Sequence, residues 1–203
     1  MDANPRAAGV VIAGGRSTRF GGEKAVATFR GEPLLLRAAR RLAAACDVVA
    51  VNARPDTQAA ALAQSLGYAV LHDAPGDPDG PLSGVKAGLQ WAAHQGAQWL
   101  AVSPCDVPLL PADLYPRLIA AAGEGAAMAV TSEGRQPLCA VWAVAALQKV
   151  SDALAGGAHP PTWRLLEEIG AVKVQFAPAA AFANANTREE LLRLEAAAQT
   201  PLP

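Results

Sequence analysis

Residues 10–24, VVIAGGRSTRFGGEK, are the stretch from which the rest of the chain can be interpreted. They open with a β-branched apolar run, which predicts a strand buried on both faces of a parallel sheet. Gly14 and Gly15 then allow a tight turn in which backbone N–H groups approach a ligand. Two arginines and Lys24 follow, at the carboxyl end of the strand, where open α/β sheets bind ligands. We expect a loop that wraps a polyphosphate, with a plain glycine-rich turn as the alternative.

Strand-like and helix-like segments alternate over the first 125 residues. This alternation predicts a three-layer α/β/α, Rossmann-like fold with a mostly parallel sheet. The expected strands lie at about 9–13, 48–51, 68–71 and 99–102, and the expected helices at about 34–45, 57–66, 82–94 and 112–122. Further on, strand-like residues 127–131 and 138–142 flank a polar turn at 133–136, which predicts an antiparallel hairpin that extends the sheet.

The composition limits the class of protein. The 203 residues are 52% hydrophobic and carry a net charge of −1, which fits one domain with a sizeable core. So small a charge argues against binding to nucleic acid or to a membrane surface. The three cysteines form no CxxC pair, and no segment has the apolar length of a membrane span or the pattern of a signal peptide. We therefore expect a cytoplasmic protein.

The loop carries a family resemblance. Its pattern, AGG-x-S-x-R-[MF]-G-x-[DE]-K, resembles the signature loop of nucleotidyltransferases that move NMP from an NTP onto a phosphate, and most of all the molybdenum cofactor guanylyltransferase (MobA) family. An extra glycine, Gly22, is a departure from the pattern. The resemblance implies a single nucleotidyltransferase domain over residues 1–203. It places a nucleotide-binding half at about 8–125 and an acceptor-binding half at about 126–198.

Three residues have catalytic roles by this resemblance. Asp106 follows the fourth strand in the sequence PCDVP, and the family's aspartate at this place holds Mg²⁺ on the nucleotide phosphates. Lys24 and Arg19 match the family's loop cations, which offset negative charge as pyrophosphate leaves. From residue type alone, Asp106 is equally a turn former, and Lys24 and Arg19 are equally solvated surface charges.

Polar residues at strand ends complete the expected nucleotide site. Asn52 and Asp73 end the second and third strands, where the family has an asparagine and an aspartate that line the nucleotide pocket. Gly80 opens the sequence GPLSG at the start of the third helix, which matches the guanylyltransferase form. For all three, turn formation is the structural alternative. The full set predicted to bind nucleotide is Ile12, Ala13, Gly14, Gly15, Lys24, Asn52, Asp73, Gly80 and Asp106.

Gly14 bears on the choice of base. The cytidylyl- and uridylyltransferase relatives have AAG where this chain has AGG. A Cβ at position 14 would narrow the pocket, so we hypothesise that Gly14 leaves room for guanine.

The acceptor site is expected near the end of the chain. Asn184 and Asn186 resemble the family segment N-[VI]-N-T-P-E-[ED]-L, with Arg188 in place of its proline, and by resemblance they line the side of the pterin or the metal. An ordinary helix N-cap is the alternative. The family's His-Pro before the hairpin's second strand is Gln136-Pro137 here, and its arginine-rich segment is residues 157–161, GAHPP.

The resemblance implies an activity and its partners. GMP would pass from GTP to the phosphate of molybdopterin, with release of pyrophosphate and with Mg²⁺ as the cofactor. GTP and molybdopterin are then the substrates, and molybdoenzymes or their chaperones are further partners that the family allows. Two alternatives stay open: a related cytidylyl- or sugar-phosphate nucleotidyltransferase, and a non-catalytic nucleotide-binding protein that delivers the cofactor.

Overall fold

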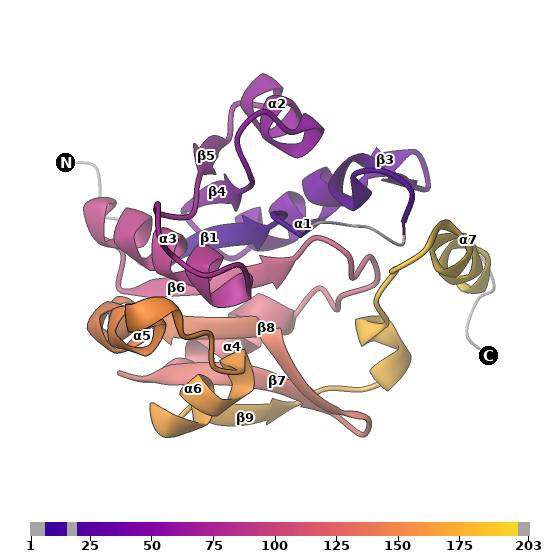
Figure 1. Ribbon diagram of the computed structural model, residues 1–203. Helices are drawn as coiled ribbons and strands as arrows, with labels where there is room; N and C mark the ends of the chain where they lie inside the picture. Colours follow the sequence, from indigo (N-terminus) through magenta and orange to yellow (C-terminus); the bar gives the residue numbers. More distant parts are fainter. Residues whose placement is uncertain (1–6, 16–19, 199–203) are drawn as a thin grey trace.

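The computed structural model describes residues 7–15 and 20–198 (Figure 1). Its strands are β1 Ala7–Ile12, β2 Thr28–Phe29, β3 Glu32–Pro33, β4 Val48–Asn52, β5 Ala69–Leu71, β6 Trp99–Pro104, β7 Ala126–Thr131, β8 Gly134–Ala143 and β9 Val172–Gln175. Its α-helices are α1 Leu34–Ala43, α2 Gln58–Ser65, α3 Pro81–His94, α4 Leu114–Ala122, α5 Leu147–Leu154, α6 Thr162–Glu168 and α7 Arg188–Ala197. The predicted alternation of strands and helices is confirmed, with ends that differ by up to two residues.

Seven strands form the main sheet in the order β5-β4-β1-β6-β8-β7-β9. Strand β8 is antiparallel to both of its neighbours, and the other paired strands run parallel. The chain moves outward from β1 to β4 and β5, then returns to place β6 on the other side of β1. This reversal puts the carboxyl ends of β1 and β6 side by side, which is where such sheets bind ligands.

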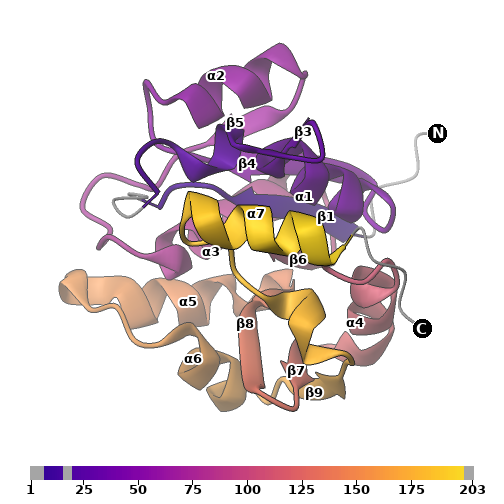
Figure 2. The ribbon, with the colours of Figure 1, turned by 90° about the vertical axis from the view of Figure 1, so that its right-hand side faces the viewer.

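The sheet separates two apolar cores. In β1, Val11 faces the core shared with α1, α2 and α4, and Val10 faces the core shared with α3, α5 and α6. Alternate residues of the strand thus pack on opposite faces, as expected for a strand apolar on both sides. Figure 2 shows α3, α5 and α6 on one side of the sheet and α1 and α4 on the other, which confirms the predicted α/β/α layering.

One local prediction is wrong. Residues 134–136, expected in a polar turn, belong to β8, and the turn is formed by Ser132 and Glu133. Hydrogen bonding to β7 extends the strand through these polar residues, because the hairpin's end needs no apolar face. A small antiparallel hairpin, β2 paired with β3, precedes α1.

Helix α7 returns to the carboxyl edge of the sheet (Figure 2). Leu191 of α7 packs with Phe20, Phe29 and Leu34 in a third apolar cluster, which also contains Ala185. The C-terminal segment is thereby anchored against the exit of the glycine loop and the β2–β3 hairpin.

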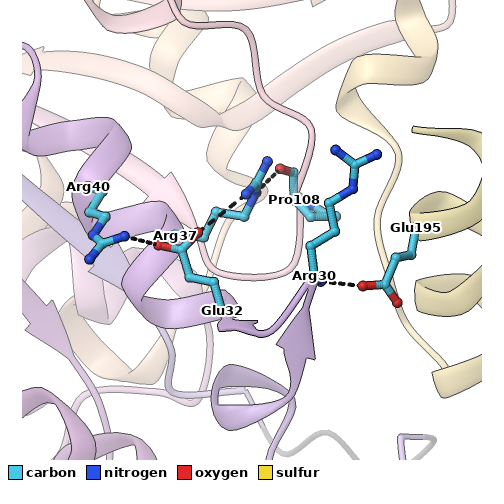
Figure 3. A network of polar contacts seen from close by, with 6 residues as sticks. All are labelled: Arg30, Glu32, Arg37, Arg40, Pro108 and Glu195. Carbon is cyan, nitrogen blue, oxygen red and sulfur yellow. Dashed lines mark hydrogen bonds and ion pairs between the residues drawn. The ribbon is translucent and has the colours of Figure 1, made fainter. Parts of the chain in front are cut away.

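Polar contacts strengthen this junction (Figure 3). Glu32 of β3 pairs with Arg37 and Arg40 of α1, and Arg37 Nε donates to the Pro108 carbonyl at 2.6 Å. The Arg37 guanidinium also lies over the Phe29 ring, 5.0 Å from its centre. At the turn between β2 and β3, the backbone N–H of Arg30 donates to Glu195 of α7. The network therefore joins the hairpin to α1, to the loop after β6 and to α7.

Candidate active site

A cavity of about 580 Å³ lies at the carboxyl ends of β1, β4, β5 and β6. Every residue that the sequence predicts to bind nucleotide lines it: Ile12, Ala13, Gly14, Gly15, Lys24, Asn52, Asp73, Gly80 and Asp106. The topology explains this convergence, since parallel strands end at one edge of the sheet. Segments far apart in the sequence thus form one concave site.

One side of the cavity is built around Asn52, which is buried with 3% of its surface exposed. Its amide Nδ2 donates to Asp73 Oδ1 at 2.9 Å, so the ends of β4 and β5 are linked through side chains. The backbone N–H of Ala13 donates to the Asn52 carbonyl at 2.8 Å and links β1 to the same point. Gly84 of α3 lies against Asn52, where a Cβ would come within 2.5 Å of Oδ1. The absence of a side chain at Gly84 therefore lets α3 begin beside the cavity.

The opposite side holds an ion pair between Lys24 and Asp106. Lys24 Nζ lies 2.9 Å from Asp106 Oδ2 and 2.9 Å from Asn186 Oδ1. The two charged side chains are 12% and 25% exposed, so salt screens the pair less than it would on the open surface. The backbone carbonyl of Asp106 accepts a hydrogen bond from the N–H of Ala185 at 2.8 Å. The segment before α7 therefore contacts both members of the pair.

Glu23 holds the backbone next to Lys24 in place. Its two carboxylate oxygens accept hydrogen bonds from the N–H groups of Gln58 and Ala59, both at 2.8 Å. Thr57 Oγ1 accepts from the Ala60 N–H at 3.2 Å, as a helix N-cap does. These amides at the start of α2 are already satisfied, so this helix end is not the phosphate site. The start of α2 instead anchors the backbone at Glu23, next to Lys24.

The start of α3 is also occupied within the chain. The Leu82 N–H points at His159 Nε2, 3.3 Å away, which requires that this nitrogen carry no proton. Gly80 has a φ of 151°, and a Cβ there would lie 2.1 Å from the same ring nitrogen. His159 thus packs on the glycine that lines the cavity. No local sequence pattern predicts this contact, because His159 and Leu82 are 77 residues apart.

Cys105, which also lines the cavity, is suited to no thiol chemistry. Removal of the thiol from water, together with the Asp106 carboxylate, raises the pKa of Cys105 to about 12. The thiol is therefore protonated at neutral pH, and a protonated thiol is a poor nucleophile.

The donor set limits how a metal ion can bind. Within the described part of the chain, no group of three or more His, Cys, Asp or Glu side chains is placed to hold a metal. Asp106 contributes a single carboxylate, which fits Mg²⁺, since this ion is held by one or two carboxylates with substrate phosphates and water. The residues present therefore fit a cation that enters together with a nucleotide.

Not every predicted residue lines the cavity. Asn186 lies behind Lys24, and Asn184 is exposed; neither is among the described residues that form the cavity wall. Arg19 lies outside the described residues. The prediction also missed several wall residues: Glu23, Arg54, Thr57, Asp79 and Leu138. Glu23 could have been found as the acidic position of the [DE]-K motif, whereas Arg54 and Asp79 follow strand ends without a recognisable pattern.

Comparison with known proteins decides the family. The model of the MobA-like NTP transferase domain matches residues 9–172. The chain belongs to the MobA-like NTP transferase family. The MobA-like match begins in β1 and ends in β9, so it spans the whole main sheet.

Individual MobA-like proteins resemble almost the full chain. A molybdenum cofactor guanylyltransferase of Cereibacter sphaeroides is 40% identical over 189 residues, which are 92% of this chain and 94% of the relative. One of Cupriavidus pinatubonensis is 36% identical over 198 residues, covering 93% of this chain and 96% of the relative.

Among solved structures, molybdopterin-guanine dinucleotide biosynthesis protein A of Archaeoglobus fulgidus superposes with a TM-score of 0.75. It is 20% identical, and the match covers 94% of this chain and 98% of that one, which supports the same fold. Within the described residues of the present MobA-like chain, no helix has the length and apolar character needed to cross a membrane.

Proposed function

We propose that this MobA-like chain transfers GMP from GTP to the phosphate of molybdopterin and releases pyrophosphate. The observation that carries the proposal is the cavity at the switch point of the sheet, where the ion pair of Lys24 and Asp106 faces the wall of Asn52 and Asp73. The choice of GTP and molybdopterin as substrates follows the name of relatives that match over nearly their full length, molybdenum cofactor guanylyltransferase.

The reaction needs no nucleophile from the protein. An oxygen of the acceptor phosphate attacks the α-phosphorus of GTP and forms a new P–O bond, while the bond from the α-phosphorus to the bridging oxygen of the leaving group breaks. The electron pair of that bond leaves with pyrophosphate, where negative charge develops. Catalysis then depends on positioning and on cations close to that charge.

Lys24 and Arg19 are the cations proposed for this task, and Asp106 is the proposed metal ligand. A bound Mg²⁺ would neutralise phosphate charge and polarise the oxygens around the α-phosphorus. The ammonium of Lys24 lies 2.9 Å from Asp106 Oδ2. Nucleotide phosphates would supply the negative charge that lets a second cation approach the same carboxylate.

The remaining assignments follow the geometry of the cavity wall. Ile12, Ala13, Gly14 and Gly15 form the proposed nucleotide-binding loop, with Gly80 on the opposite rim. Asn52 and Asp73 are proposed to contact the nucleoside, since they form a linked pair of polar groups. Asn184 and Asn186 remain proposed for the acceptor side. Residues 8–125 would form the nucleotide-binding half and 126–198 the acceptor half, in a protein of the cytoplasm that serves molybdoenzymes or their chaperones.

Pyrophosphate release tests the proposal. The purified protein would be incubated with Mg²⁺, molybdopterin and one of GTP, CTP, UTP or ATP, with a sugar phosphate replacing molybdopterin in parallel reactions. We expect release with GTP and molybdopterin together and at most background with either alone. Release with CTP, or with the sugar phosphate as acceptor, would assign the chain to a related transferase. GTP binding without release in any reaction would favour a delivery protein.

A further inference from the structure

The position of the Lys24 ammonium depends on the segment that precedes α7. Its Nζ donates to Asp106 Oδ2 and to Asn186 Oδ1, each at 2.9 Å. An ammonium group is a compact charge on a flexible stem, so it is placed by the acceptors around it. Asn186 is one of these acceptors, and its own orientation therefore matters for Lys24.

The backbone of Asn186 is fixed in turn by Glu190 of α7. One carboxylate oxygen, Oε2, accepts hydrogen bonds from the N–H of Asn186 at 2.6 Å and from the N–H of Thr187 at 3.1 Å. Thr187 Oγ1 returns a bond by accepting from the Glu190 N–H at 3.1 Å, which completes a capping box. A capping box needs only the Thr187 and Glu190 bonds. The bond to Asn186 is an addition, and it is the shorter of the two that Oε2 accepts.

The helix that carries Glu190 has an independent anchor. Leu191 is 5% exposed and packs in the apolar cluster with Phe20 and Phe29. Ala185, buried in the same cluster, donates its N–H to the carbonyl of Asp106. The segment 185–191 is thus held at both ends by packing. Between these ends, the Glu190 carboxylate fixes the orientation of the backbone N–H groups of Asn186 and Thr187.

We propose that Glu190 is a positioning residue, which acts through Asn186 to hold the Lys24 ammonium at the cavity. Glu190 is not part of the cavity wall and touches neither Lys24 nor Asp106 by any described contact. The inference rests on the proposed function in one respect: Lys24 is taken to act on the nucleotide phosphates. The link from Glu190 to Lys24 itself is a property of the folded chain and can be measured without substrate.

The hydrogen bonds of Glu190 indicate that the length of its side chain, and not its charge, positions the Asn186 backbone. A single oxygen accepts both backbone N–H groups, so the reach of the side chain is needed and its charge is not. Glu190→Gln keeps the length and an acceptor oxygen but loses the charge. Glu190→Asp keeps the charge but is one methylene shorter. The proposal therefore predicts that the glutamine variant resembles wild type and that the aspartate variant does not.

Two neighbouring substitutions are matched controls. Thr187→Ala removes the bond to the Glu190 N–H and so weakens the cap, but it leaves the carboxylate on the Asn186 backbone. Glu189→Ala removes an exposed acidic residue from the same first turn of α7, and it takes one negative charge from the helix N-terminus, as Glu190→Gln does. A role limited to helix stability would make these variants resemble Glu190→Asp.

The first measurement is the NMR spectrum of side-chain ¹³Cε–¹⁵Nζ groups in protein labelled at lysine. The chain has four lysines, and Lys24→Ala assigns the Lys24 signal. We expect that signal to move in Glu190→Asp and in Asn186→Ala, and to stay at its wild-type position in Glu190→Gln, Thr187→Ala and Glu189→Ala. Adding Glu190→Asp to Asn186→Ala should cause no further movement.

The second measurement is steady-state turnover of GTP and molybdopterin. Displacement of a catalytic group by about 1 Å lowers rates by about 100-fold, so kcat in Glu190→Asp should fall by about 10- to 100-fold. The KM for GTP should change much less, and the fall should disappear in the Asn186→Ala background.

The proposal is overturned if the Lys24 signal is unmoved in Glu190→Asp, or if Glu190→Gln or Glu189→Ala moves it equally. Failure of the proposed function has a different signature: the wild-type protein would release no pyrophosphate, and the lysine spectra would still report on Glu190.

Discussion

The ammonium of Lys24 lies 2.9 Å from a carboxylate oxygen of Asp106, although the two residues are 82 positions apart in the sequence. One follows the glycine loop and the other follows β6, and the parallel arrangement of β1 and β6 brings them together. The two charges neutralise each other across this contact. A triphosphate that enters with a cation would give both groups new partners.

Replacement of Asp106 tests the proposed metal ligand. In Asp106→Asn we expect kcat to fall by about 100-fold or more, which is typical when a preorganised electrostatic group is removed from an active site. GTP binding measured by calorimetry without a divalent cation should be unchanged or tighter, because a negative charge has been removed near the phosphates. Asp113→Asn, at an exposed ion pair with Arg117, is the control. Near-normal turnover in Asp106→Asn would refute the metal role.

Lys24→Met should weaken GTP binding and lower turnover, since it removes a cation but keeps an apolar stem of similar length. Binding is best compared at two salt concentrations, because the contribution of a charge to phosphate binding is screened by salt. Lys173→Met is the matched control, since that lysine is 49% exposed on β9 and pairs with Glu167. Equal affinities in both variants would mean that the loop does not bind phosphate through Lys24.

Gly14 and Gly84 both lie near Asn52, and the effects of alanine at the two positions should differ. A Cβ at Gly14 would lie 3.6 Å from Asn52 Oδ1, an ordinary contact, so Gly14→Ala should leave the thermal midpoint almost unchanged. If guanine needs the space, the preference for GTP over CTP should decrease.

At Gly84 the corresponding distances are 2.5 Å to Oδ1 and 3.0 Å to Ile12 Cδ1. Gly84→Ala should therefore destabilise the fold by about 1–3 kcal/mol, as overpacking of a core does. Thermal unfolding of both variants checks the contrast. An unchanged ratio of GTP to CTP affinity in a stable Gly14→Ala protein would remove Gly14 as the basis of base selection.

Burial of the Cys46 thiol should lower the free energy of unfolding at alkaline pH. Burial raises the pKa of Cys46 from 9.0 to about 12, with Asp47 as the smaller cause. The thiol ionises in the unfolded chain above pH 9 but stays protonated in the folded chain. The free energy of unfolding is thus unaffected below pH 9 and falls between about pH 9 and 12, by about 1.4 kcal/mol per pH unit for this group.

Urea unfolding at pH 8, 9 and 10 measures this effect. The loss of stability from pH 9 to 10 should be smaller in Cys46→Ala than in wild type by up to that amount. Curves that fall in parallel would show that Cys46 ionises equally in both states.

Elements that depend on residues close together in the sequence could be predicted from the sequence alone. The β-branched run before Gly14 predicted β1, and the helix N-cap considered for the segment that contains Asn184 and Asn186 is present as the capping box of Thr187 and Glu190. The polar ends of successive strands predicted a shared edge, and the cavity contains Asn52 and Asp73 as expected. Patterns of period two or 3.6 and cap residues carry this information within a few positions.

Contacts between distant segments were beyond such patterns. Glu23 binds the start of α2, 35 residues away, and His159 binds the start of α3, 77 residues away. The strands β2 and β3 have two residues each, too few to show a period. The contact between the Asn186 amide oxygen and Lys24, 162 residues apart, likewise depends on the packing of the C-terminal segment and follows from no local pattern.

Transfer of label from [α-³²P]GTP tests directly whether the protein moves GMP from GTP to molybdopterin. The protein would be incubated with Mg²⁺, molybdopterin and GTP labelled at the α-phosphorus, beside GTP labelled at the γ-phosphorus, and the products separated. We predict that the α-label enters a molybdopterin dinucleotide and that the γ-label appears in pyrophosphate. An α-label that remains in GTP or GMP while molybdopterin is present would contradict transfer of GMP, as would labelling of molybdopterin by [α-³²P]CTP as efficient as that by GTP.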